Sequence, residues 1–212
     1  MRVLDLGCGP GSITVGLGPR AIGLDRHPVT VPGVPVVAGD GARLPFRDGS
    51  FDAVYANAVL QHVPDAAAVV SEVRRVAGPG AVVGLGDVDW DARLLHPADP
   101  LLERGQRIQE ALRDGGDVRV GRRLRGLLAG AGFEGVEVAV TGSAVGTAEA
   151  VAATARFEGD WFEAPEVVEH VTALRLSDPA EMAAVAAAWH RWGADPAACS
   201  ATCWFTAVAR AP

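Results

Sequence analysis

The sequence predicts an α/β fold in which a doubly wound sheet of seven strands is mostly parallel. Three observations lead to this prediction. Short apolar runs alternate along the chain with helical patterns, as βαβ units require. Successive runs near the start of the chain contain or end in acidic residues, and a glycine-dense turn follows the first of them. The length of 212 residues suits one domain of this class with an added segment.

The first apolar run leads directly into the glycine-dense turn. Residues 3–11 are VLDLGCGPG, so a short strand containing Asp5 is followed by glycines at alternate positions. Glycine adopts positive φ without strain and lets a ligand approach the bare main chain. The spacing G-x-G-x-G differs from the G-x-G-x-x-G of dinucleotide sites, and an acid precedes it. The turn therefore indicates a cofactor site that includes Asp5, Gly7, Cys8, Gly9 and Gly11.

The next two apolar runs indicate the chemistry of that cofactor. A pyrophosphate favours helix-end amides and basic side chains. S-adenosylmethionine (SAM) has no phosphate; it offers a sulfonium, an ammonium, two ribose hydroxyls and an adenine. Residues 21–25 end in Asp25, which suits the ribose hydroxyls, and residues 36–40 end in Asp40, which can accept from the adenine amino group. A single Asp after a strand is more often a turn former or a helix cap. Three acids in this order favour SAM over NAD.

The remaining elements follow the same alternation. A strand is predicted over 52–56, and Pro64 and Asp65 begin a helix over 66–76. Later elements follow from apolar periodicity and from glycine or proline boundaries: a strand at 81–85, helices at 100–113 and 122–131, and strands at 136–140 and 202–209. We expect a single domain over 1–212, with a cofactor-binding core in 1–146, a helical cap insertion in 147–198 and the last strand in 199–212.

Four segments resemble one protein family. They are residues 4–12 (LDLGCGPGS), 39–46 (GDGARLPF), 51–63 (FDAVYANAVLQHV) and 74–81 (RRVAGPGA). As a set they resemble the class I SAM-dependent methyltransferases, in the group labelled methyltransferase type 11 or ubiquinone-biosynthesis-like. The rest of the chain resembles actinobacterial members more loosely, which implies a bacterial source.

The resemblance implies a Rossmann-like sheet with an antiparallel last strand and a helical insertion before that strand. It also implies SAM as cofactor and S-adenosylhomocysteine as product, as in the EC 2.1.1 class. The cofactor site that it implies includes four further residues: Arg26, Gly41, Asn57 and Ala58.

The chain departs from the family in the segments that normally cover the sheet. Family members usually have a helical segment before the first strand, whereas this sequence begins on the strand. The first helix, over 12–17, is short, and the segment between Asp25 and Val34 is interrupted by prolines and a glycine. We expect one of three explanations: an open cofactor pocket, cover supplied by a second subunit, as in a homodimer, or a late start site for the given sequence.

Composition excludes several classes of function. The net charge is −7 and all nineteen basic residues are arginines, so a broad nucleic-acid surface and lysine-based chemistry are not expected. Cys8, Cys199 and Cys203 form neither a disulfide framework nor a zinc pattern, and we expect them to be small buried residues of a reduced cytoplasmic protein. No apolar run approaches a membrane span, and Met1-Arg2 precedes a strand, which argues against a signal peptide.

The acceptor of the methyl group is expected beyond the ends of the fourth and fifth strands. His62 is the first candidate for a general base because its protonation changes near neutral pH, although a histidine stacked at a helix start is the alternative. Asp87 is a second catalytic candidate, and Gln61, Asp89 and Trp90 are candidates for substrate binding. Asp87, Asp89 and Asp91 would suit a divalent metal only loosely, so no metal is expected and a solvated acidic turn is favoured.

Three functions remain open from the sequence. The first is methylation of a small molecule at O, N or C. The second is a natural-product cyclase or isomerase that keeps SAM without transferring its methyl group. The third is a non-catalytic SAM-binding protein. Trp189 and Trp192, at helical i, i+3 spacing, are more typical of a core than of a pocket. No motif of nucleic-acid methylases follows the fourth strand.

Overall fold

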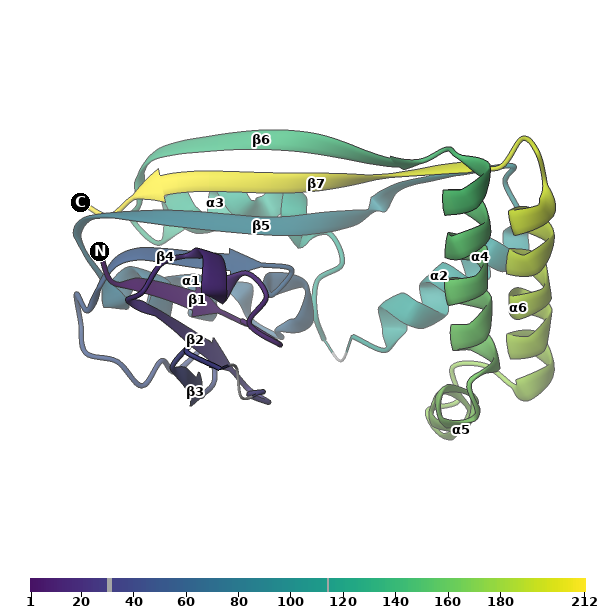
Figure 1. The fold of residues 1–212 in the computed structure, drawn as a ribbon, viewed down its shortest axis with the longest axis horizontal. Helices are drawn as coiled ribbons and strands as arrows, with labels where there is room; N and C mark the ends of the chain where they lie inside the picture. Colours follow the sequence, from purple (N-terminus) through teal and green to yellow (C-terminus); the bar gives the residue numbers. More distant parts are fainter. Residues whose placement is uncertain (30–31, 114) are drawn as a thin grey trace. The chain divides into compact units, whose positions relative to one another are not determined.

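The computed structural model describes residues 1–29, 32–113 and 115–212. Its sheet has seven strands in the order β3-β2-β1-β4-β5-β7-β6, so β7 lies between β5 and β6 (Figure 1). The strands are β1 (Val3–Leu6), β2 (Ala21–Asp25), β3 (Val36–Ala38), β4 (Phe51–Asn57), β5 (Ala77–His96), β6 (Glu134–Val145) and β7 (Cys199–Arg210). Strands β1 to β5 pair in parallel and the last strands are antiparallel, which confirms the predicted fold class.

The parallel register brings the carboxyl ends of the central strands to one edge of the sheet. Leu6 of β1 is level with Leu24 of β2 and with Ala56 of β4, which in turn is level with Leu85 of β5. The turns that follow β1, β2 and β4 therefore start side by side, next to a strand, β5, that continues past them. In an open α/β sheet this edge is where ligands bind.

One face of this sheet packs against helices. Alternate residues such as Leu4, Leu6 and Val54 are buried in one cluster with residues of α1 (Ala66–Val76) and α3 (Leu124–Gly130). The predicted start of α1 is confirmed, because the Asp65 carboxylate caps the helix by accepting from the Ala68 amide at 2.9 Å. Burial of these apolar stripes holds α1 and α3 to the sheet.

The two segments in which the chain departs from the family contain little helix. The predicted helix at 12–17 is a single 3-10 turn, η1 (Thr14–Gly16). Residues 26–29 and 32–34 form no helix, and the rest of that segment, residues 30–31, lies outside the described residues. Accordingly Tyr55 and Gly84, which face away from the α1 core, are half-buried.

The chain divides into two compact units. The first comprises residues 1–89, 115–141 and 204–212, and the second comprises 90–114 and 142–203. The second unit contains α2 (Pro100–Ala111), α4 (Ala148–Glu163), α5 (Pro165–Ala173) and α6 (Pro179–Ala194). The helical segment expected at 147–198 falls within this unit, which also takes in residues 90–114.

The second unit has its own apolar core. Trp189 and Trp192 are buried with their ring centroids 5.5 Å apart in an edge-to-face arrangement, as their i, i+3 spacing predicts. Glu158 is buried among these helices and accepts from Arg93 at 3.1 Å and from Gln109 at 2.8 Å. The Arg93 guanidinium also lies 5.2 Å from the centre of the Trp189 ring. A buried ion pair stacked on an aromatic ring thus links β5, α2, α4 and α6.

Three expectations about individual residues need correction. Strand β5 does not end at Leu85 but continues to His96, so Asp87 and Asp89 lie inside the strand rather than after it. Cys199 is exposed and Cys203 is half-buried, whereas both were expected to be buried; Cys8 is buried as expected.

Among the described residues, no helix combines the length and apolar character that a membrane-spanning segment requires.

Candidate active site

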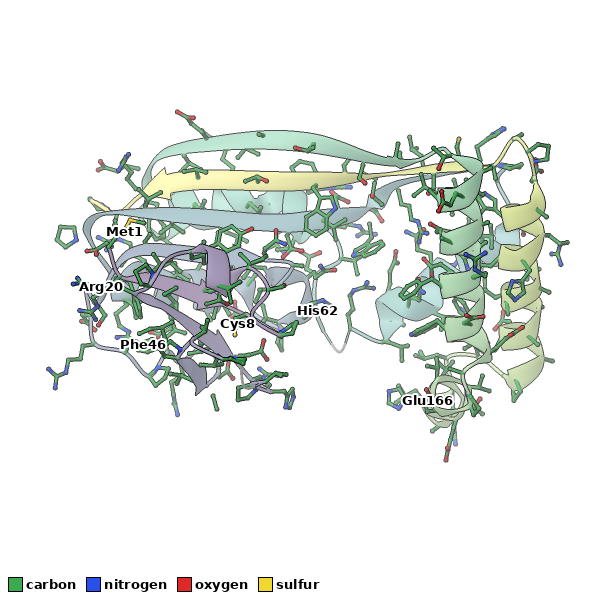
Figure 2. The ribbon with its side chains drawn as sticks, in the orientation of Figure 1. Met1, Cys8, Arg20, Phe46, His62 and Glu166 are labelled. Carbon is green, nitrogen blue, oxygen red and sulfur yellow. The ribbon has the colours of Figure 1, made fainter. Side chains whose placement is uncertain are left out.

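A cavity of about 330 Å³ lies in the first unit, where the turns leave the carboxyl ends of the parallel strands. This volume is at the lower end of the range for small-molecule sites. Its walls come from four turns and the strand ends beside them: Leu6, Gly7, Leu24, Asp25, Arg26, His27, Gly39, Asp40, Gly41, Ala58, Val59, His62 and Val63. Figure 2 shows Cys8 and His62 toward this end of the strands, and Met1, Arg20 and Phe46 toward the opposite end.

The glycine-dense turn forms one wall and depends on glycine at Gly7. This residue has φ +69°, and a Cβ there would lie 2.4 Å from Cγ2 of Val59. No other residue type therefore fits without moving the chain. The amides of Gly7 and Cys8 both donate to the Leu24 carbonyl, at 2.7 and 3.1 Å. The turn is consequently fixed to the end of β2.

Asp25 and Asp40 stand at two successive strand ends of the same cavity. The Asp25 carboxylate accepts from the Gly9 amide at 2.9 Å and from the His27 amide at 2.9 Å. Asp40 accepts from the Ala42 amide at 2.9 Å. Each carboxylate oxygen can accept more than one hydrogen bond, so both side chains retain capacity for ligand hydroxyl or amino groups.

Arg26 supplies positive charge beside these acids. Its guanidinium lies 3.3 Å from the second carboxylate oxygen of Asp40, and both side chains are about half exposed. His27 also lines the cavity. The acids are therefore arranged with one arginine partner at the rim rather than with a cluster of cations.

Asp5 and Cys8 lie behind the cavity wall. Asp5 is buried and accepts a hydrogen bond from the Thr14 hydroxyl, which ties η1 to β1. Burial raises the pKa of Asp5, while the Thr14 bond opposes that rise. Burial also raises the pKa of the Cys8 thiol, and the nearby Asp5 and Asp25 carboxylates add to the rise. Neither residue lines the cavity, and neither do Gly9 and Gly11.

The opposite wall is a turn of residues 58–63, called here the post-β4 turn. It contains the 3-10 turn η2 (Leu60–His62), and its cavity-lining residues are Ala58, Val59, His62 and Val63. Ala58 has φ +57°, a conformation that is costly for a residue with a Cβ, and its amide donates to the Gly86 carbonyl at 2.9 Å. Asn57 and Gln61 flank these residues without lining the cavity.

Asp87 and Asp89 are buried in β5 rather than presented to a substrate. Asp87 accepts only main-chain hydrogen bonds among those described, from the amides of Leu60, Gln61 and Val88. Burial raises the pKa of Asp87 to about 6, and these amide bonds oppose the rise. Asp89 forms a two-bond ion pair with Arg122.

Three candidates are thus not among the residues that line the cavity. Asp87 and Asp89 are held as above, and the Trp90 ring belongs to the second unit, 4.8 Å from the Arg113 guanidinium. Within residues 1–29, 32–113 and 115–212, no group of three His, Cys, Asp or Glu is placed to hold a metal ion.

Several cavity residues were missed by sequence reasoning. They are apolar or glycine residues next to the predicted ones, together with one histidine: Leu6, Leu24, His27, Gly39, Val59 and Val63. The signal that could have found them is position, because each lies within three residues of a predicted site residue.

Comparison with known proteins finds relatives of part of the chain. A family described as a methyltransferase domain matches residues 4–85. The chain is 36% identical over 149 residues to an uncharacterized 37.1 kDa protein in a transposon of Streptomyces fradiae. The match covers 61% of this chain and 42% of that protein. It is 37% identical over 118 residues to a demethylmenaquinone methyltransferase of Roseiflexus, covering 49% of this chain and 47% of the relative. The matched regions thus span less than half the length of these relatives.

Solved structures share the fold. A candidate methyltransferase from Bacillus halodurans has a TM-score of 0.63 at 19% identity, over 100% of this chain and 92% of the other. The 4+2 cyclase SpnF has a TM-score of 0.58 at 21% identity, over 100% of this chain and 74% of the other. The matched domain over residues 4–85, the strand order and the glycine-dense turn agree, and together they support a class I SAM-dependent methyltransferase.

Proposed function

We propose that the cavity binds SAM and that the chain transfers its methyl group to a small-molecule acceptor at O, N or C. The observation that supports this most strongly is the pair of carboxylates, Asp25 and Asp40, at successive strand ends of one cavity beside a glycine-dense turn. SAM is cationic and has no phosphate, so a site lined by acids suits it better than a diphosphate. The family of the first unit supports the same cofactor.

The residues present fit this cofactor. Asp25 would accept from the ribose hydroxyls, and Asp40 would accept from the adenine amino group, with Gly41 beside it. Gly7 lets a ligand lie against the main chain, as a bulkier residue would not. When bound, SAM supplies a methyl group already activated on a sulfonium. The chain then has to hold the acceptor in line and exclude competing water.

His62 is the group in the post-β4 turn that we assign to proton transfer. It lines the cavity, and imidazole changes protonation near neutral pH. An acceptor with an O–H or N–H group would give its proton to His62 as the methyl group arrives. His62→Asn should therefore slow methylation of a protonated acceptor without abolishing SAM binding. Full activity in His62→Asn would remove His62 from this role.

Calorimetric titration tests cofactor binding directly. We expect the wild-type protein to bind SAM with micromolar affinity and not to bind NAD(H). Asp25→Ala should weaken SAM binding by about 10-fold to 100-fold, because it removes a charged hydrogen-bond acceptor. Asp52→Ala is the matched control, since Asp52 is exposed and accepts from the Arg2 amide at the other end of the sheet. Equal SAM affinity in Asp25→Ala and the wild type would contradict the assignment.

A second candidate function is cyclisation or rearrangement with SAM retained, and the fold shared with a cyclase is the observation that favours it. Release of S-adenosylhomocysteine with an acceptor supports methyl transfer. A product formed without consumption of SAM supports the cyclase. SAM binding with no product from any acceptor supports a non-catalytic binding protein.

The composition and the half-buried face of the sheet bear on the type of acceptor, the location and the oligomeric state. A net charge of −7 favours a small-molecule acceptor over nucleic acid, and we propose that the protein acts in the bacterial cytoplasm. The half-buried face around Tyr55 and Gly84 supports a homodimer in which a second copy covers the sheet. Light scattering during size-exclusion chromatography measures this; a monomeric mass at micromolar concentration would contradict it.

A further inference from the structure

We propose that Asp87 is a positioning residue that fixes the post-β4 turn, and with it His62, against the cofactor cavity. The two sites are separate: the turn lines the cavity, whereas Asp87 is fully buried behind it in β5. This role replaces the expectation that Asp87 takes part in proton transfer. The inference rests on the proposed function for the identity of the ligand, but its geometric part rests on contacts alone.

The contacts of Asp87 are directed at the start of η2. Its Oδ2 accepts from the amide of Leu60 at 2.8 Å and from the amide of Gln61 at 3.2 Å, while Oδ1 accepts from the amide of Val88 at 3.0 Å. The first amides of a helical turn have no partner within the turn. One carboxylate from β5 therefore caps η2, and His62 follows directly in the chain.

A second attachment holds the same turn to β5. The Ala58 amide donates to the Gly86 carbonyl at 2.9 Å. A Cβ at Gly86 would lie 2.5 Å from the side-chain oxygen of Asn57, so glycine at this position lets Asn57 pack closely. Ala58 keeps a left-handed conformation that persists only where its surroundings enforce it. Asp87 and Gly86 supply that enforcement from neighbouring positions of one strand.

Two charged residues near Asp87, Asp89 on β5 and Arg122 on η3 (Val120–Arg123), pair with each other. Asp89, two residues further along β5, forms its ion pair with Arg122. Gly121 lies against the main chain of β5, because a Cβ there would be 2.9 Å from the carbonyl oxygens of Asp87 and Val88. Asp89 thus fixes η3 and Asp87 fixes η2. Because the two acids are similarly buried, substitution of Asp89 serves as the control for substitution of Asp87.

A carboxylate is required at position 87 because both of its oxygens are used. Asparagine has one acceptor oxygen and one amino group. Asp87→Asn would therefore lose either the bonds to Leu60 and Gln61 or the bond to Val88. An amino group facing a backbone amide would also repel it. We expect the turn to open locally while the surrounding core persists.

Amide hydrogen exchange measured by NMR tests the attachment without any ligand. In Asp87→Asn the amides of Leu60 and Gln61 should exchange about 10-fold to 100-fold faster than in the wild type. The amides of Val83 and Leu85, in the core part of β5, should keep their wild-type rates. In Asp89→Asn, Leu60 and Gln61 should stay protected. Unchanged exchange at Leu60 and Gln61 in Asp87→Asn, or acceleration throughout the core, would overturn the inference.

Gly86→Ala provides the test if Asp87→Asn does not fold. The Cβ of the new alanine would displace Asn57 and so weaken the second attachment of the same turn. The exchange rates of the Leu60 and Gln61 amides are judged in the same way as for Asp87→Asn. Gly126→Ala, at a helix position with open space around the missing Cβ, controls for a general effect of glycine replacement.

Binding and rate measurements then separate positioning from catalysis. Asp87→Asn should weaken SAM binding about 10-fold in calorimetry. The pH profile of kcat in Asp87→Asn should keep the limb that is lost in His62→Asn, because Asp87 exchanges no proton with the acceptor. Loss of that limb in Asp87→Asn would make Asp87 a proton-transfer group and overturn the inference. If wild-type protein does not bind SAM, the proposed function fails, while the exchange rates still decide the role of Asp87.

Discussion

The acids at the strand ends of the first unit and the buried acid of the second unit use their charge in opposite ways. In the first unit Asp25 and Asp40 face a cavity, and their described partners are mostly main-chain amides. In the second unit the buried acid Glu158 is paired with Arg93 inside the helical packing. The first arrangement leaves acceptor capacity for a ligand, whereas the second consumes it. Charge at the first unit's strand ends thus serves binding, and charge in the second serves packing.

Removal of Glu158 should give the largest effect on stability. Glu158→Ala leaves the buried Arg93 guanidinium without its carboxylate, so we expect a loss of about 3–5 kcal/mol in the free energy of unfolding. Glu163→Ala on the same helix is the control, because Glu163 is exposed and should cost less than 1 kcal/mol. Urea denaturation measures both. Equal effects in the two variants would remove the contrast between buried and exposed charge in this unit.

Replacement of Gly7 tests whether the glycine-dense turn of the first unit contributes to stability and to SAM binding. Gly7→Ala places a Cβ against Val59 and forces alanine into positive φ, so we expect a cost of about 2–5 kcal/mol together with loss of SAM binding. The Gly126→Ala control should slightly stabilise α3. Denaturation and calorimetry on the same samples report both effects. Wild-type SAM affinity in Gly7→Ala would show that the glycine-dense turn does not contribute to the cofactor site.

The pH dependence of stability should reveal the cost of the buried Asp87 charge. The pKa of Asp87 is about 6 in the folded protein and about 4 in an unfolded chain, so the folded state binds the proton more tightly. The stabilising contribution of the protonated form is complete below about pH 4 and is lost as pH rises through about 6. We expect the wild type to lose about 2–3 kcal/mol relative to Asp87→Asn between these limits. A constant difference between pH 4 and pH 8 would contradict this.

The smallest effect is expected at a pair of the second unit whose side chains are each 33% exposed. Arg104 binds Glu181 through Nε at 2.9 Å and Nη2 at 3.0 Å, and also donates to the Leu176 carbonyl. Because solvent screens this pair, Glu181→Gln should cost about 0.5–1 kcal/mol. Denaturation in low and high salt measures it. A cost as large as that of Glu158→Ala would show that exposure does not govern the strength of these pairs.

The sequence predicted the sheet and the strand-end acids because these features are local. A glycine-dense turn and an acid after an apolar run can be recognised within ten residues, and Asp25 and Asp40 lie at the cavity accordingly. The length of β5 could not be predicted in this way. An acid in an apolar run ends a strand unless a distant partner neutralises it, and Arg122 and the amides of η2 do so for Asp89 and Asp87. Exposure of Cys199 likewise depends on packing around β7.

Strand β6 has a practical consequence for work with the purified protein. It lies at the edge of the sheet, and all its residues except Val136 and Val145 are exposed. The unpaired main-chain groups of an open strand edge can form hydrogen bonds with another extended segment. Glu134 and Glu137 are the charged residues of β6 that oppose such pairing. We expect self-association in concentrated or high-salt samples to start here, and Val140→Lys to keep the solution monodisperse in dynamic light scattering.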